Sequence, residues 1–365
     1  MGVTETYDRS RTLLRERPGL VLVGLVAIGL VLDLFRKLAV GDLTVAAVVG
    51  YLWNGTVIGL VIGLAGIGLS LTYSILSFAN FSHGEYLTVG AFTGWTAASL
   101  VAGFGSAAVA DLVLLNASPR VVGITIAAEP LAVLAGLLVA IVVTILVALV
   151  VDRLAYRPMR DAGGISLLIA SIGVALALRY LVVLVYSSDI QGLTAGSGPS
   201  FQPVVFDGTV TFSAHELTLV VSALTLMTGV HLLLQRTKLG KAMRAMADNK
   251  DLARVTGIPT ERVVRWTWII GAGLAGAAGY LIALERGAMT FNLGWVLLLL
   301  IFAAVILGGI GSIYGAMLGG VAIGVVRNVS LIWIPSDFSL AAAFLIMILI
   351  LLFRPEGIFG GVTTA

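Results

Sequence analysis

Long apolar segments dominate this 365-residue chain and decide what it can fold into. A helix needs roughly 20 apolar residues to cross the apolar core of a bilayer. Only 11% of the residues are charged and the mean hydropathy is +1.07, so the chain lacks the charge to solvate a soluble surface. The sequence predicts an all-α polytopic membrane protein with about 8–10 transmembrane helices, some broken at glycines or re-entrant. The predicted spans lie near residues 20–38, 45–76, 86–107, 131–151, 165–186, 217–234, 265–284, 294–309, 313–330 and 338–353.

The loops between these segments give an orientation. Loop 235–265 carries eight Lys and Arg residues and loop 152–164 carries three, whereas segment 187–216 carries none. Because cytoplasmic loops are enriched in Lys and Arg, both basic loops are predicted to be cytoplasmic and segment 187–216 external. Alternation of the spans then places the tails 1–19 and 356–365 in the cytoplasm, on either side of a single transmembrane domain over residues 20–355.

A polar cluster interrupts the apolar pattern after residue 76. It consists of Asn80, Ser82, His83 and Glu85. An unpaired charge costs about 2.5–3.5 kcal/mol inside a membrane helix, so the cluster is predicted to face protein or water rather than lipid. Alternation of the spans places it at the cytoplasmic face, where Asn80 and Ser82 would cap the next helix. The alternative is a broken helix that lines or gates a path, and we expect a structural or gating network rather than a high-affinity binding pocket.

A second candidate segment is rich in glycine. Residues 307–320 contain six glycines among fourteen residues. Two interpretations stay open: close helix packing, or an unwound bend whose backbone faces a cavity. The runs 45–76 and 294–330 are each compatible with one tilted span, two short spans or a broken helix. The candidate path residues in this segment are Gly308, Gly309, Gly311 and Ser312.

The basic loop, residues 235–265, is predicted to contain a helix over 241–255 that ends at Gly257. Met243, Met246 and Ala247 share one face of that helix and form an apolar patch amid charge. The loop is either a solvated positive loop or a short helix that docks in a groove of another protein.

The external segment 187–216 carries a hairpin signal. Residues 204–212 read as two short strands around Asp207-Gly208. The segment is either a passive linker or a structured cap that receives a soluble partner.

Several kinds of chemistry have no matching motif. Gly240-Lys241 lacks the upstream glycine of a phosphate-binding loop and is followed by Ala242. The three histidines are far apart in the sequence, and there is no cysteine. The spans also lack the repeated carboxylates typical of a proton-driven pump. We therefore expect no catalytic residue, no metal site and no bound cofactor. If the chain is a transporter, its energy is expected to come from elsewhere.

Three motifs in register resemble the permease subunits of ABC importers for branched-chain amino acids, of the Liv type and its H-type subunit. The first motif is Gly68-Leu69-Ser70-Leu71-Thr72-Tyr73, followed by Asn80-Phe81-Ser82-His83-Gly84-Glu85. The second is Gly240-Lys241-Ala242-Met243-Arg244-Ala245, followed by Gly257-Ile258. The third is Ala304-Val305-Ile306-Leu307-Gly308-Gly309-Ile310-Gly311-Ser312-Ile313-Tyr314-Gly315-Ala316, followed by Arg354-Pro355-Glu356-Gly357-Ile358-Phe359-Gly360. The chain departs from the family in its first 45 residues, in Ser82 where Ala is usual, and in long inserts near 103–128 and 187–216.

The resemblance implies an import machine in the cell membrane. Two homologous permease subunits would form the pore, two cytoplasmic ATPases would bind ATP and Mg²⁺, and an external binding protein would deliver branched-chain amino acids. Urea or short amides are the alternative cargo, and a self-powered secondary transporter or channel is the alternative class. No nucleic acid is expected as a partner. The capped helix with its apolar face, together with the resemblance, predicts ATPase coupling at Gly240, Lys241, Met243, Arg244, Met246 and Gly257. The polar cluster and the glycine-rich segment predict translocation-path or gating residues at Asn80, Ser82, His83, Glu85, Gly308, Gly309, Gly311 and Ser312.

Overall fold

The structure is a computed structural model that describes residues 18–160, 162–194, 196, 198–354 and 357–358. The predicted cytoplasmic tails, 1–19 and 356–365, lie almost entirely outside these residues. The chain forms two compact units, one built from residues up to 50 and 202–210, the other from 51–201 and 211 onward.

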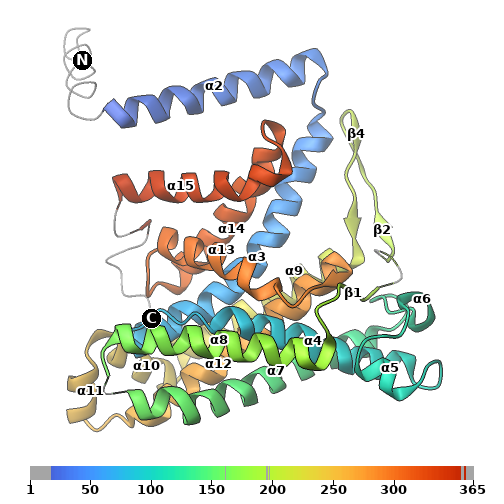
Figure 1. Cartoon of the computed structure of the whole chain (residues 1–365). Helices are drawn as coiled ribbons and strands as arrows, with labels where there is room; N and C mark the ends of the chain where they lie inside the picture. The colour runs from blue at the N-terminus through green and yellow to red at the C-terminus, as the bar shows by residue number, and fades with distance from the viewer. Residues whose placement is uncertain (1–17, 161, 195, 197, 355–356, 359–365) are drawn as a thin grey trace, which may run out of the picture. The chain divides into compact units, whose positions relative to one another are not determined.

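Every predicted apolar segment folds as a helix (Figure 1). Seven of the described helical segments are long and apolar enough to cross a membrane, by their length and composition. The fold is therefore an all-α polytopic membrane protein, as predicted. The long helices are α2 (Pro18–Val40), α3 (Val45–Leu76), α4 (His83–Gly103), α7 (Pro130–Val151), α8 (Gly164–Tyr186), α9 (Ala214–Arg236), α12 (Thr260–Arg286), α13 (Leu293–Gly308), α14 (Ile313–Val329) and α15 (Ser339–Phe353).

Short elements connect these helices in the larger unit. They are α5 (Val109–Val113), α6 (Pro119–Val122), the π-helical turn η1 (Asp152–Tyr156), η2 (Arg157–Met159), α10 (Lys238–Asp248), α11 (Lys250–Val255), η3 (Ser330–Ile332) and η4 (Ser336–Phe338). Two antiparallel strand pairs also lie in this unit: β1 (Gln191–Gly192) with β6 (Ala288–Met289), and β2 (Ser200–Phe201) with β5 (Phe212–Ser213).

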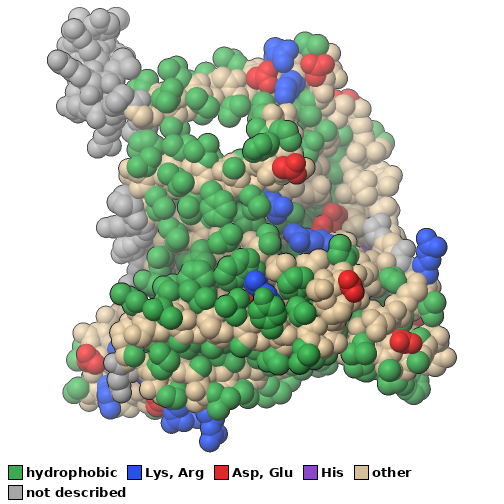
Figure 2. Space-filling model, viewed as in Figure 1, with side chains coloured by type: hydrophobic (Ala, Val, Ile, Leu, Met, Phe, Trp, Pro, Cys, Tyr) green, Lys and Arg blue, Asp and Glu red, His purple; other side chains and the backbone are tan. Residues whose placement is uncertain are grey.

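Burial separates central from peripheral helices. The apolar windows of α3 and α12 are 89% and 94% buried, whereas those of α8 and α15 are 22% and 11% buried. Large apolar side chains such as Ile165, Ile169 and Leu184 point outward from α8, and Figure 2 shows hydrophobic side chains along that helix. Helices with apolar outer faces suit contact with lipid, so α3 and α12 form the centre of the unit and α8 and α15 its surface.

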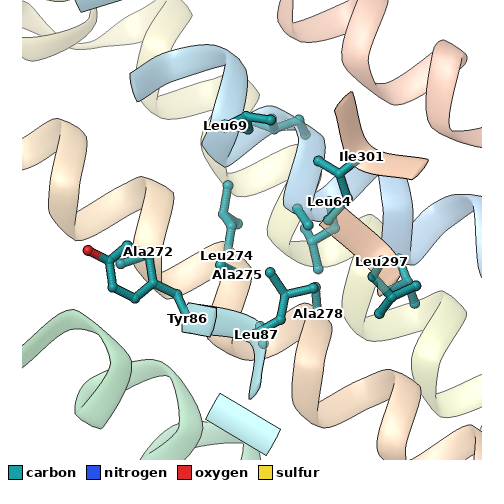
Figure 3. Close-up of a cluster of buried hydrophobic side chains, with 14 of the residues drawn as sticks. Leu64, Leu69, Tyr86, Leu87, Ala272, Leu274, Ala275, Ala278, Leu297 and Ile301 are labelled. Carbon is teal, nitrogen blue, oxygen red and sulfur yellow. The ribbon is translucent and has the colours of Figure 1, made fainter. Parts of the chain in front are cut away.

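The core of the larger unit forms where α3, α4, α12 and α13 meet. Figure 3 shows a buried hydrophobic cluster that joins these four helices through side chains such as Leu64, Leu87 and Ile301. Glycines bring the helices into close contact. A Cβ placed on Gly90 of α4 would lie 2.3 Å from the Cα of Gly276 of α12, so only glycine permits this approach.

The two long glycine-containing runs, 45–76 and 294–330, have different structures. Residues 45–76 form one helix of 32 residues, without a break. Run 294–330 is broken into α13 with 16 residues and α14 with 17 residues. The broken-helix alternative therefore holds for the second run only.

The smaller unit contains α2, the start of α3 and a hairpin of β3 (Val204–Val205) with β4 (Gly208–Thr209). The predicted hairpin is confirmed, but its turn is Phe206-Asp207 rather than Asp207-Gly208. The Asp207 carboxylate accepts the backbone N–H groups of Val45 at 3.0 Å and Ala46 at 3.3 Å, so it caps the start of α3. These bonds hold the pKa of Asp207 below its usual value.

Candidate functional site

The segment between α3 and α4, residues 77–82, re-enters the helix bundle. Ser77 adopts φ 57°, which ends α3, and its carbonyl oxygen lies 3.2 Å from the position of a Cβ on Gly164, the first residue of α8. Farther along α8, the Ser171 hydroxyl accepts the backbone N–H of Phe81 at 3.0 Å. The segment therefore runs along α8 into the bundle, where irregular backbone is tolerated because protein surrounds it. The predicted position of the cluster at the cytoplasmic face stays a prediction.

A buried ion pair lies at the inner end of this re-entry. Arg179 of α8 donates to Glu85 Oε1 through Nη2 at 2.5 Å and through Nε at 3.1 Å. Its guanidinium also lies 4.6 Å from the ring centroid of Trp295 at the start of α13. Gly164 and Arg179 are separated by about 22 Å along the helix at about 1.5 Å per residue. Glu85 is thus far from the end of α8 where the segment enters.

Sequence reasoning missed Arg179 as the partner of Glu85. A signal was present, because Arg179 is the single charged residue of the apolar run 165–186. Opposite charges inside apolar spans pair with one another in membrane proteins. The contact between Glu85 and Arg179 could therefore have been predicted from the sequence.

An amide and two hydroxyl groups form a second part of the network. The Ser82 hydroxyl donates to Asn80 Oδ1 at 2.7 Å and shares a hydrogen bond of 2.8 Å with the Tyr156 hydroxyl. Tyr156 also donates to Asn80 Oδ1 at 3.3 Å, and its ring stacks on Trp268 of α12 at 5.2 Å. Ser82 occupies the N-cap position of α4, but its side chain makes no capping bond, so its predicted capping role is wrong. The network uses that hydroxyl to join η1 to the start of α4.

His83 links α4 to α3. Its Nε2 lies 2.9 Å from the Ala65 carbonyl oxygen in the middle of α3. Asn80, Ser82, His83 and Glu85 are each at most 1% exposed, which confirms that the cluster faces protein rather than lipid. The four residues thus bind three different elements, η1, α3 and α8. We call them, with Tyr156 and Arg179, the polar network.

The second candidate segment forms an unwound bend over residues 309–312, the glycine bend. Gly309 and Gly311 have φ values of 99° and 91°, which side-chain-bearing residues rarely adopt. The Gly311 N–H donates to the Ser70 hydroxyl of α3 at 3.2 Å. Ser312 is buried, and its hydroxyl accepts the N–H of Gly315 at 3.0 Å, so it caps α14.

Close helix packing occurs at the same place. A Cβ on Gly308 would lie 1.9 Å from the Gly315 carbonyl oxygen, and one on Gly319 would lie 2.2 Å from that of Ala304. The close-packing interpretation of the glycine-rich segment is therefore confirmed for the contact between α13 and α14. The segment is also unwound at the bend, but its predicted exposure to a cavity stays a prediction.

The basic loop contains two helices instead of the single predicted helix over 241–255. α10 ends at Asp248 and α11 begins at Lys250, because Asn249 adopts an extended conformation and its side chain accepts the N–H of Leu252 at 2.9 Å. Asn is a strong N-cap residue, so the break has a local cause. Gly257 ends α11 with φ 84°, as predicted.

The apolar patch predicted on this loop is not exposed. Met243 and Met246 are 0% and 2% exposed, because α10 packs against α9. Gly240 permits that contact, since a Cβ there would lie 1.9 Å from the Leu234 carbonyl oxygen at the end of α9. Arg244 donates to the same carbonyl oxygen through Nη1 at 2.7 Å. Of the six predicted coupling residues, Lys241 and Gly257 remain exposed.

Two other apolar side chains are exposed on the basic loop. Leu252 and Val255 of α11 are 60% and 85% exposed. They lie three residues apart on one side of the helix. Sequence reasoning missed them because it took Met243 and Met246 for the exposed apolar patch of this loop.

An ionic network joins the two basic loops. Arg160 donates to both carboxylate oxygens of Asp152 at 2.8 and 3.0 Å, and also pairs with Glu261 at the start of α12. Arg157 lies 3.7 Å from the same glutamate. These contacts fix the position of the basic loop's C-terminal end.

The three histidines lie apart and have separate partners. His83 contacts Ala65, His215 accepts the N–H of Ile126 at 3.3 Å, and His231 shares a 2.6 Å hydrogen bond with Tyr314. Within the part of the chain that the structure describes, no group of three His, Cys, Asp or Glu side chains could hold a metal ion.

Comparison with known proteins identifies the family. The family model described as "Branched-chain amino acid transport system / permease component" matches residues 51–352. The chain is 31% identical over 313 residues to the high-affinity branched-chain amino acid transport system permease protein BraD of Pseudomonas aeruginosa, covering 84% of this chain and 94% of that protein. It is 30% identical over 320 residues to the permease protein LivH of Escherichia coli K12, covering 85% and 94%.

The chain also matches part of a second permease protein. The chain is 27% identical over 126 residues to the permease protein LivM of Escherichia coli K12, covering 34% of this chain and 29% of that protein. No solved structure matches the chain. The family match covers most of the chain, including the re-entrant segment, the glycine bend and the basic loop, and it agrees with the resemblance drawn from the three motifs. The chain belongs to the permease family of branched-chain amino acid transport systems.

Proposed function

We propose that this chain is a permease subunit of an ATP-driven ABC importer, and that the importer moves leucine, isoleucine and valine into the cytoplasm. The observation that carries the proposal is the match to branched-chain amino acid permeases over residues 51–352, with relatives covered over 94% of their length. A fold dominated by apolar helices, with charged loops between them, supports a multi-pass position in the cell membrane.

The energy source in this proposal is a pair of separate cytoplasmic ATPases that bind ATP and Mg²⁺. The chain has no glycine-rich phosphate-binding motif, which supports placing ATP hydrolysis on other subunits. An external binding protein supplies the cargo. The basic loops and both termini face the cytoplasm, in line with the distribution of Lys and Arg.

A second, homologous permease completes the pore. The chain is similar to LivH and, over a shorter stretch, to LivM, two permease proteins of the same organism. Two related subunits with different sequences fit a pseudo-symmetric pair, in which each chain supplies one half of the interface. We therefore favour a heterodimeric permease.

The basic loop is the ATPase-coupling element in this proposal. Leu252 and Val255 expose apolar surface on α11, next to the exposed cations Lys250 and Arg254. A short helix that presents apolar anchors within a charged rim suits docking into a groove of another protein. Met243 and Met246 help to position this surface, because they are buried where α10 packs against α9.

A pair of double variants tests the coupling element. Leu252→Asp/Val255→Asp places charge on the exposed face and is expected to abolish uptake and ATPase co-purification, while the permease itself folds and inserts normally. Met243→Asp/Met246→Asp places the same charge in the core and is expected to lower the yield of folded permease. Uptake and ATPase co-purification at the wild-type level in the first variant would contradict the assignment.

The polar network and the glycine bend act on gating in this proposal. The polar side chains are buried within the subunit, and an importer fed by a binding protein needs no second high-affinity site. His83→Ala is expected to lower the maximal uptake rate and leave the half-saturating concentration of binding protein unchanged.

A further inference from the structure

A groove of about 360 Å³ lies between α10 and the first turns of α12. This size falls within the roughly 300–1,000 Å³ of typical ligand sites. The groove is separate from the polar network and from the exposed pair on α11. Its walls are Lys238, Leu239, Ala242, Pro259, Arg262, Val263 and Trp266.

The lining of this groove is amphipathic. Val263 is buried at its base, and Leu239 and Ala242 are half-buried beside it. Trp266 is 36% exposed and forms part of the outer wall. An apolar channel with an indole at its side is suited to a hydrocarbon chain.

Two cations stand at the rim without a protein counter-charge. Lys238 and Arg262 are exposed, and neither forms an ion pair with any residue that the structure describes. The nearest carboxylate in sequence, Glu261, is already bound to Arg160 and lies 3.7 Å from Arg157. The rim therefore carries uncompensated positive charge.

The groove lies where membrane-spanning helices end. α9 ends at Arg236, two residues before Lys238, and Trp266 lies in the second turn of the apolar helix α12. Trp, Lys and Arg concentrate at the level of the lipid headgroups. Figure 2 shows Lys and Arg side chains at the end of the unit where α10 and α11 lie.

We propose that this groove binds one anionic phospholipid, with an acyl chain along Leu239, Val263 and Trp266 and the headgroup phosphate between Lys238 and Arg262. Basic pockets between membrane helices recognise anionic headgroups in this way. The bound lipid links α10 to α12, the two helices that position the coupling element. The inference stands apart from the cargo, because it depends on the position and charge of the groove alone.

The test uses the purified permease in phosphatidylcholine nanodiscs doped with dibrominated lipid, a short-range quencher of tryptophan fluorescence. The Trp266 signal is the difference between wild type and Trp266→Phe. Dibromo-phosphatidylglycerol is expected to quench this signal at lower mole fractions than dibromo-phosphatidylcholine. Lys238→Gln/Arg262→Gln is expected to weaken the preference about thirtyfold, since each cation contributes about fivefold.

The matched control is Lys250→Gln/Arg254→Gln, which removes the same charge from exposed positions on α11 outside the groove. It is expected to keep the preference for phosphatidylglycerol. Equal quenching by both lipids in the wild type would overturn the proposal. An equal loss in the control variant would also overturn it, because the preference would then be a general surface-charge effect. Protection of Trp266 from both lipids upon adding the ATPase subunits would make the groove a protein contact instead.

Discussion

Glu85 and Arg179 bring opposite charges together inside a helix bundle whose core is mostly apolar. Burying two charges costs desolvation free energy, and their attraction repays it only when both are present. Arg179 contributes two donors to one carboxylate oxygen and also contacts the Trp295 ring. The pair therefore fixes the start of α4 against α8 and α13.

Removing one partner of the Glu85–Arg179 pair is expected to lower the free energy of unfolding more than removing both partners. Glu85→Gln and Arg179→Leu should each lower the free energy of unfolding by about 3–5 kcal/mol, because each leaves one buried group uncompensated. The double variant should lose less than the sum of the two. Thermal unfolding of the purified protein in detergent, followed by intrinsic fluorescence, measures the difference. Arg265→Gln, at an exposed position of α12, serves as control and should change stability by less than about 0.5 kcal/mol. Additive losses in the double variant would show that the two charges do not act as a pair.

At the scale of elements, two breaks interrupt the long helices, at the re-entrant segment and at the glycine bend. The second break depends on a contact between backbones, since a Cβ on Gly308 would overlap the Gly315 carbonyl oxygen. Gly308→Ala is therefore expected to destabilise the protein by about 1–3 kcal/mol, as overpacking does in a close-packed core. Gly229→Ala on α9 is the matched control, because nothing lies within 4 Å of a Cβ there. Fluorescence-detected size-exclusion chromatography after heating compares the two. Equal stability of both variants would mean that α13 and α14 do not need this close approach.

The Asp207 carboxylate joins the hairpin of β3 and β4 to the start of α3. The N–H bonds from Val45 and Ala46 lower the pKa of this carboxyl from its usual value of 3.8. A group with a lowered pKa stabilises the fold above its unfolded pKa, and that contribution is lost as the pH falls through the folded value. Hydrogen exchange in residues 204–209, corrected for the intrinsic rate, should therefore show protection at pH 6 that declines below pH 3.8. Asp207→Asn should show reduced protection at pH 6 and a weaker dependence on pH. The same pH dependence in the variant would exclude Asp207 as the cause.

The helices of this fold were predictable from the sequence, whereas their depth in the bundle was not. Apolar length predicted each helix, because a membrane span needs a long uninterrupted apolar run. Asn80 and Glu85 lie inside the bundle because the segment around them is re-entrant. Hydropathy does not reveal this, since the same residues have the same hydropathy in a surface loop. Met243 and Met246 appeared as a surface patch because helical periodicity identifies an apolar face without stating what covers it. The covering helix, α9, becomes evident only from the contact between Gly240 and Leu234.

At the scale of the whole molecule, this chain belongs to a family of transport permeases, and we propose that it forms half of a pore. Its central helices are packed through glycines and a buried polar network, and its basic loop exposes Leu252 and Val255. A channel or secondary transporter would work as a single polypeptide driven by an ion gradient. A permease subunit requires ATPases, a second permease and a binding protein.

The most direct test is reconstitution of the chain into proteoliposomes with the second permease, the two ATPases and the binding protein. Uptake of radiolabelled leucine is measured with ATP and Mg²⁺ on the ATPase side. We expect leucine uptake to require ATP and the binding protein. Isoleucine and valine should inhibit it by competition, and urea and short amides should leave it unchanged. Leucine uptake by the chain alone under an ion gradient, or ATP hydrolysis stimulated by urea and not by leucine, would contradict this expectation.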